Sequence, residues 1–171
     1  MNKLFCYVVL LCSFFGSYAQ RKSQQQIDPS QIPAAVRTSQ QSNFPYVQTV
    51  RWEIRDLMSS RKFITKYVAV FDVESNAIRA RYKGDGTLVS SSKFFNSEQA
   101  PGQIKNLGGR FNDYKLKSAE EIKTYTKGKL FYRGYFFKGK KRLVAYVDDN
   151  GKELTEEKVP AEVKEDEEAD N

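Results

Sequence analysis

Arginines and aromatic side chains alternate along several stretches of this sequence, and together they form a candidate binding surface. Such a mixture favours protein recognition, because Arg and Tyr are enriched at the centres of protein interfaces. A second interpretation stays open, since an antiparallel sheet often has one wet face where rings and basic stems cover each other. The candidate partner-binding residues are Arg51, Lys66, Arg79, Arg81, Phe131, Arg133, Tyr135, Arg142 and Tyr146.

The residue types that most catalytic and metal sites need are scarce. The sequence has no histidine, and its two cysteines, Cys6 and Cys12, lie in a segment that we expect to be removed. Histidine-based nucleophilic triads are therefore excluded, zinc sites are nearly excluded, and no phosphate-binding glycine loop is present. Carboxylate-pair hydrolysis stays open in principle. The acidic candidates Asp72, Glu74 and Asp85 stand at expected strand ends, where turn residues are common.

Residues 148–151, Asp-Asp-Asn-Gly, have some features of a calcium-binding loop. They lack its alternating ligands and its closing glutamate, and Lys152 follows directly. Asn-Gly is a strong hairpin signal, because both residues tolerate positive φ. The pattern predicts a turn, and we expect no catalysis, no cofactor and no metal.

The N-terminal residues predict export. Lys3 is the only charge before Arg21. Residues 4–15 form an apolar run, and Gly-Ser-Tyr-Ala follows it at residues 16–19. This is the pattern of a secretory signal peptide (residues 1–19) cleaved after Ala19. The alternative, a membrane anchor, needs about 20 apolar residues, more than this run supplies. The mature chain is therefore expected to be periplasmic or secreted, with no transmembrane segment.

Charge divides the mature chain. Residues 20–147 carry 24 basic and 10 acidic residues, whereas residues 148–171 carry 11 acidic and 3 basic ones. This division indicates an anionic partner, screening of the body by its own tail, or charges that are simply solvated, and solvation is the favoured interpretation for the tail. Residues 20–29 predict a flexible segment and residues 161–171 a disordered acidic tail. Exported proteins seldom meet nucleic acid, so we do not expect a nucleic-acid partner.

The sequence also contains an internal repeat. At an offset of 68 residues Ile54 matches Ile122, which puts Glu120 in the place of Trp52. Further along, at an offset of 65, Tyr67 matches Tyr132, Phe71 matches Phe136, Ala80 matches Ala145 and Gly86 matches Gly151. The pattern predicts two structural units, residues 30–96 and 97–160.

Each unit is expected to contain a helix followed by four antiparallel strands. Helical spacing of apolar residues predicts helices near residues 32–39 and 104–111, and two glycines in the second should shorten it. Alternation and turn residues predict strands at 49–54, 63–71, 77–82, 87–95, 115–126, 129–137, 141–148 and 153–159. The expected fold class is α+β: two tandem units, each a helix plus a four-stranded antiparallel sheet, with sheets that can join.

Alternation also assigns the two faces of the strands. The residues expected to face the helices are Val50, Trp52, Tyr67, Ala69, Phe71, Ile78, Ala80, Tyr82, Tyr132, Phe136, Leu143, Ala145 and Val147. The candidate binding residues lie on the opposite face.

A family resemblance accompanies these patterns. Its motifs are Phe44-Pro45-Tyr46, Val50-x-Trp52, Tyr67-x-Ala69-x-Phe71, Ala80-x-Tyr82 and Asp85-Gly86. Across residues 32–160 the chain resembles the PepSY-like secreted proteins, which are β-lactamase-inhibitor-like. The resemblance implies a tandem fold with one curved sheet surface and an exported, non-catalytic role. The second unit departs from the motifs, since Gly134 replaces Ala69.

The sequence thus predicts a secreted binding protein without catalytic activity. The first hypothesis is an inhibitor-like module that binds another exported or envelope protein through its basic and aromatic sheet face. The alternative is an envelope protein that binds an anionic ligand, lipid or glycan. A carboxylate-based hydrolase is the remote third hypothesis.

Overall fold

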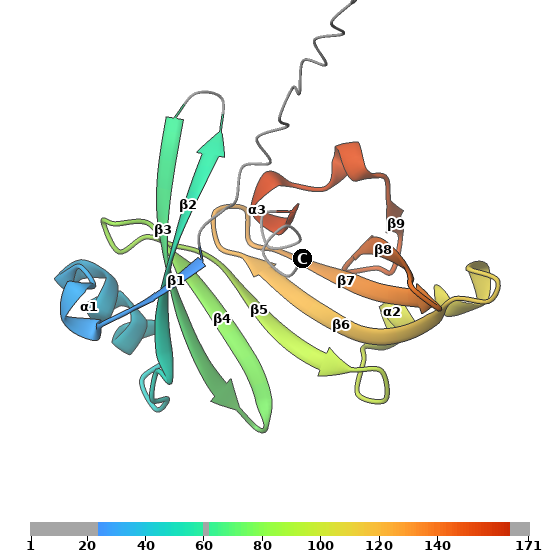
Figure 1. The fold of residues 1–171 in the computed structure, drawn as a ribbon, viewed down its shortest axis with the longest axis horizontal. Coiled ribbons are helices and arrows are strands. Elements are labelled where there is room, and N and C mark those ends of the chain that lie inside the picture. Colours follow the sequence, from blue (N-terminus) through green and yellow to red (C-terminus); the bar gives the residue numbers. More distant parts are fainter. Residues whose placement is uncertain (1–23, 60–61, 165–171) are drawn as a thin grey trace, which may run out of the picture.

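One antiparallel sheet of nine strands dominates residues 24–59 and 62–164, the part of the chain that the computed structural model describes. Each strand pairs with the next one in sequence, so the sheet is a meander (Figure 1). The strands are β1 (Gln24–Ile27), β2 (Arg51–Ser59), β3 (Lys62–Val73), β4 (Asn76–Tyr82), β5 (Leu88–Asn96), β6 (Lys115–Thr124), β7 (Lys129–Lys138), β8 (Lys141–Asp148) and β9 (Glu153–Leu154). The helices are α1 (Ala34–Asn43), α2 (Gly102–Lys105) and α3 (Ala161–Lys164).

The sheet curves, and its two faces are covered differently. Helices α1 and α2 lie outside the curve, whereas α3 lies inside it (Figure 1). We call the side that carries α3 the concave face and the side that carries α1 and α2 the convex face. The fold is mostly sheet, so the expected pair of helix-plus-sheet units appears as one continuous sheet with short helices, joined where β5 pairs with β6.

Helix α1 closes the first core on the convex face. The Asp28 side chain accepts a hydrogen bond from the backbone N–H of Ser30 at 2.8 Å, which caps a short 3₁₀ turn before the helix. Val36 of α1 is fully buried in a cluster with Trp52 and Phe71. Burial of such side chains contributes about 1.5–3 kcal/mol each.

Helix α2 closes the second core and is short, as its glycines predict. Ile104 is fully buried against the convex side of β7 and β8. A Cβ at Gly134 would lie 3.3 Å from the Ile104 side chain and 2.7 Å from the Phe136 ring. Gly134 therefore departs from the motif because the helix approaches the sheet closely at this point.

The predicted faces of the strands are confirmed with one exception. Val50 is 67% exposed rather than buried under α1. Val50 precedes β2, so the alternation of the strand does not fix the direction of its side chain. Its backbone N–H still donates to Val70 O at 2.8 Å. The other predicted helix-facing residues pack in the two convex cores: Trp52, Tyr67, Ala69, Phe71, Ile78, Ala80, Tyr82, Tyr132, Phe136, Leu143, Ala145 and Val147.

Both ends of the described chain differ from the predictions. Residues 24–29 were expected to be flexible, but residues 24–27 form β1 and a 3₁₀ turn begins at Pro29. Backbone pairing of β1 with β2 does not require apolar side chains. The strand expected at 153–159 stops at Leu154, and a 3₁₀ turn and α3 follow. Residues 161–164 were expected to be disordered, but Val163 is 1% exposed and packs on the concave face. The expected signal peptide and residues 165–171 lie outside the described residues.

The offset of 68 residues between the first strands of the two units is wrong by one. Ile54 pairs with Tyr67 in the first unit, and Glu121 pairs with Tyr132 in the second, so Glu121 rather than Ile122 corresponds to Ile54. Ile54 consequently packs on the convex side, whereas Ile122 packs under α3. Glu120 corresponds to Glu53 rather than to Trp52, because both glutamates lie on the concave face.

Candidate functional site

The nine candidate binding residues share the concave face. Directly paired residues of neighbouring strands point to the same side of a sheet. Arg51 pairs with Val70, Val70 pairs with Arg79, and Arg133 pairs with Tyr146, so the members of each pair share one face. The concave set is Arg51, Lys66, Arg79, Arg81, Phe131, Arg133, Tyr135, Arg142 and Tyr146.

The expectation that this whole face is open is wrong. Arg133 is fully buried, Arg81 is 1% exposed and Lys66 is 7% exposed. Phe131 and Tyr146 are buried beneath Val159 and Val163 of the C-terminal segment, and Tyr135 is buried too. The curvature of the sheet brings side chains of distant strands together, which alternation along a single strand does not reveal.

Glu120 is the centre of the buried charges. Arg133 donates from Nε to Glu120 Oε2 at 2.7 Å and from Nη2 to the same oxygen. Tyr135 Oη donates to it at 3.4 Å, and Arg81 Nη2 lies 4.0 Å from Oε1. Sequence reasoning missed this carboxylate, because the offset of 68 residues put it in the place of the core residue Trp52 rather than of Glu53.

Glu53 holds a second, similar cluster on β2. It is 1% exposed and accepts from Arg51 Nε at 2.9 Å and from Arg55 Nη2 at 3.0 Å. Burial opposes ionisation of Glu53, but the two hydrogen bonds outweigh it and lower the pKa of the carboxyl. The signal in the sequence was Arg-x-Glu-x-Arg, three charges on one side of a strand.

The two arginines around Glu120 differ in their electrostatics. Burial lowers the pKa of Arg81, and Glu120 offsets this only in part. Burial also disfavours the charge of Arg133, but the close Glu120 carboxylate outweighs it and raises the pKa of Arg133. Arg133 and Glu120 are therefore a tight ion pair, with Arg81 as a more distant cation.

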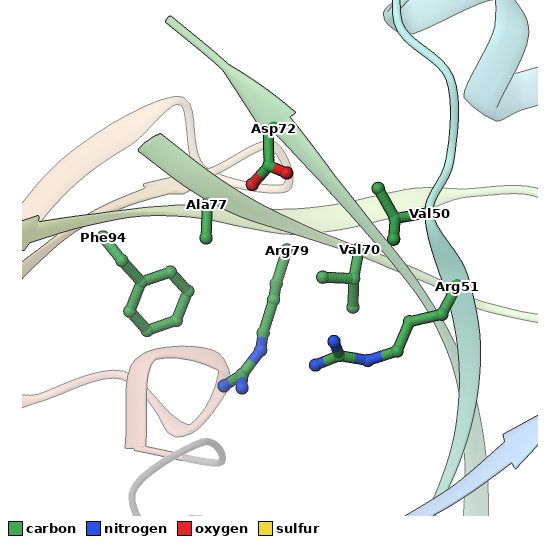
Figure 2. A pocket seen from close by; sticks show the side chains of 7 residues that line it. All are labelled: Val50, Arg51, Val70, Asp72, Ala77, Arg79 and Phe94. Atoms are coloured by element: carbon green, nitrogen blue, oxygen red, sulfur yellow. The ribbon is translucent and has the colours of Figure 1, made fainter. Parts of the chain in front are cut away.

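The more accessible part of the concave face contains a pocket of about 300 Å³. Figure 2 shows Arg51 and Arg79 extending their guanidinium groups into the same space, with Val70 between their stems and Phe94 beside Arg79. The Arg79 guanidinium lies 4.8 Å from the centre of the Phe94 ring. The lining residues are Val50, Arg51, Val70, Asp72, Ala77, Arg79 and Phe94.

A second pocket of about 220 Å³ continues across the sheet and shares Phe94 with the first. Two further cations stack on rings here: Lys117 Nζ lies 5.1 Å from the Phe137 ring, and the Arg142 guanidinium lies 5.3 Å from the Tyr135 ring. The lining residues are Phe94, Lys117, Ser118, Tyr135, Phe137 and Arg142. We call the two pockets together the basic–aromatic groove.

The groove offers recognition chemistry. Stacked cations and rings bind carboxylates and apolar side chains. Asp72 is the single carboxylate among the described residues that line the groove, and a carboxylate-pair hydrolase needs two. Sequence reasoning identified Arg51, Arg79, Tyr135 and Arg142 but not the two phenylalanines. Alternation along one strand could have found Phe137, two residues from Tyr135. Phe94 reaches Arg79 only through the pairing of β4 with β5.

The acidic turn residues have structural partners. Asp148 Oδ1 accepts from the backbone N–H of Asn150 at 3.0 Å and of Lys152 at 2.9 Å, which confirms the turn predicted there. Asp85 Oδ1 accepts from Thr87 N at 2.9 Å, and this hydrogen bond lowers the pKa of Asp85. In the described ranges no group of three potential metal-binding side chains comes together.

The protein is a curved antiparallel sheet with an accessible groove on one face. Comparison with solved structures shows which known fold this is. A BLIP-like protein from Bacteroides fragilis shares the fold with a TM-score of 0.55 and 13% identity, over 75% of this chain and 85% of that one. A DUF2874 family protein from Bacteroides uniformis matches with a TM-score of 0.56 and 11% identity, over 72% and 86%. A protein from Bacteroides eggerthii that carries a periplasmic assignment matches with a TM-score of 0.57 and 13% sequence identity, over 72% of this chain and 86% of that one.

These similarities establish a BLIP-like fold. No protein-family model matches the chain, and no curated protein sequence matches it, so the PepSY-like resemblance stays an expectation. Within residues 24–59 and 62–164, no helix is long and apolar enough to cross a membrane.

Proposed function

We propose that this chain is an exported, non-catalytic protein that binds an extended acidic segment of another envelope protein in the basic–aromatic groove. The observation that carries the proposal is the row of three cation–ring pairs along one groove. The BLIP-like fold and the periplasmic assignment of one structural neighbour support a binding protein outside the cytoplasm. The N-terminal signal pattern supports the same compartment.

A protein segment fits the groove better than a purely ionic ligand does. Phe94 and Phe137 give the groove apolar rings, which suit side chains such as Leu or Phe between the carboxylates. A highly sulfated glycan or a lipid headgroup would use the cations alone. The partner is therefore expected to alternate acidic and apolar residues, as an extended strand does.

The test uses a synthetic octapeptide that alternates Glu and Leu, with fluorescence anisotropy as the measurement. The variant Lys117→Gln/Arg142→Gln should weaken binding about thirtyfold, since it removes two charge-assisted contacts of about 1 kcal/mol each. Lys123→Gln is a matched control. Lys123 is on the same strand as Lys117 and also lies 5.1 Å from a ring, that of Tyr125, but on the convex face.

The alternative ligands enter as competitors. Vesicles containing phosphatidylglycerol and a heparin oligosaccharide are offered to the same proteins at about 50 mM and about 500 mM salt. Peptide binding that survives high salt in part, and that the control variant keeps, supports the proposal. Equal loss in both variants, or binding of vesicles or glycan in place of the peptide, would overturn it in favour of an anionic envelope ligand.

A further inference from the structure

The C-terminal segment already occupies part of the concave face. Val163 is 1% exposed and packs with Val159 on Phe131 and Ile122. Arg133 Nη1 donates to the backbone carbonyl of Val163 at 3.2 Å. A buried arginine therefore fixes α3 on this face one residue before Lys164, where the description of the chain ends.

The sequence that follows is the most acidic of the chain. Residues 165–171 read Glu-Asp-Glu-Glu-Ala-Asp-Asn and hold five carboxylates. Basic side chains outnumber acidic ones on the face where α3 ends. The basic residues of the strands there are Arg51, Arg55, Lys66, Arg79, Arg81, Lys115, Lys117, Lys129, Arg133 and Arg142, and the acidic residues are Glu53, Asp72, Glu120 and Asp148.

We propose that residues 165–171 dock on the basic concave face as an intramolecular ligand, which a partner must displace from the groove. Seven residues extend over roughly 23 Å. The groove is within that reach, because Tyr135, which lines it, is two residues along β7 from Arg133, or about 7 Å. The displacement part of the inference rests on the proposed function, whereas the docking part does not.

The expected effect follows from tethering. A short flexible connection gives an effective concentration on the order of 1 mM. If the acidic segment binds in trans with a Kd of about 0.1 mM, the tethered segment occupies the face roughly nine-tenths of the time. The apparent affinity for a competing ligand then falls about tenfold.

The experiment uses two altered proteins beside the full chain. One ends at Lys164 and keeps every described element. In the other, the five acidic residues of 165–171 become Gln or Asn, so the length is unchanged. The probe is a fluorescein-labelled peptide with the sequence of residues 165–171, measured by anisotropy.

Both altered proteins should bind this peptide about tenfold more tightly than the full chain does, and Lys117→Gln/Arg142→Gln in the shortened chain should weaken binding. Equal affinity for all three proteins, or no binding to the shortened chain, would overturn the docking. The octapeptide separates the two proposals. If it binds the full and shortened chains equally, the groove function stands and the displacement fails. If only the peptide of residues 165–171 binds, the docking stands and the proposed partner class fails.

Discussion

Replacing the buried carboxylate of Glu120 tests the concave ion cluster directly. Glu120→Gln keeps the shape of the side chain but removes the negative charge that accepts two hydrogen bonds from Arg133. Both residues are fully buried. Breaking a buried ion pair by removing one partner costs about 3–5 kcal/mol, because the remaining charge stays away from water. For a protein of this size that corresponds to a decrease in Tm of roughly 6–20 °C.

The assay is urea unfolding at neutral pH followed by tryptophan fluorescence, since Trp52 is the only tryptophan and is buried. Glu121→Gln is the matched control, because Glu121 is the next residue of the same strand, is less buried and faces the convex side. We expect a change below about 1 kcal/mol there. The double variant Glu120→Gln/Arg133→Met should lose less stability than the two single variants together, by roughly 1–3 kcal/mol.

The result that refutes this reasoning is a Glu120→Gln protein within about 1 kcal/mol of the original. Additive losses in the double variant would also refute it, since they would mean that the two residues act separately.

Three further predictions concern other parts of the fold. The pKa of Glu53 is lowered in the folded protein, so its stabilisation is present above the unfolded pKa of about 4.3 and is lost as the pH falls through the folded value. Glu53→Gln should therefore reduce the difference between urea midpoints measured at about pH 7 and about pH 3, and an unchanged difference would contradict this. Gly86→Ala should cost about 2 kcal/mol or more, because φ is +87° and the new Cβ would lie 2.6 Å from a backbone oxygen of α1. Gly128→Ala, with φ +61° and open space, should cost clearly less; equal changes in Tm would disprove the contact. Tyr82→Phe removes the 2.7 Å hydrogen bond to the buried Gln40 and should cost about 1–3 kcal/mol in thermal unfolding, whereas a neutral result would show that the bond contributes nothing.

Much of the fold followed from local patterns. Alternation predicted seven of the strands and both faces, since side chains point to opposite sides with a period of two. Asn150-Gly151 predicted the hairpin between β8 and β9, and Gly108-Gly109 predicted a short second helix. The described strand β1 could not be found this way, because its pairing uses backbone groups of a polar, glutamine-rich segment.

The candidate site was predicted as a face but not as a cavity. Strand alternation brought Arg79 and Tyr135 to one side of the sheet, as predicted. The ring of Phe94 joins Arg79 only through the pairing of β4 with β5, whereas Phe137 follows Tyr135 by two residues on β7, so alternation alone puts it on the same side. The bulge at Leu116 also reversed the faces that an unbroken count along β6 would give.

The sequence by itself determined the charge of the concave face, because the residue types and their alternation depend on no distant contact. Only the tertiary structure decided that most of this charge is buried. Glu120 meets Arg133 across paired strands, and Val163 covers neighbouring side chains from a segment about 30 residues away. Burial depends on how the curved sheet and the C-terminal segment enclose a volume, and no local pattern encodes that enclosure.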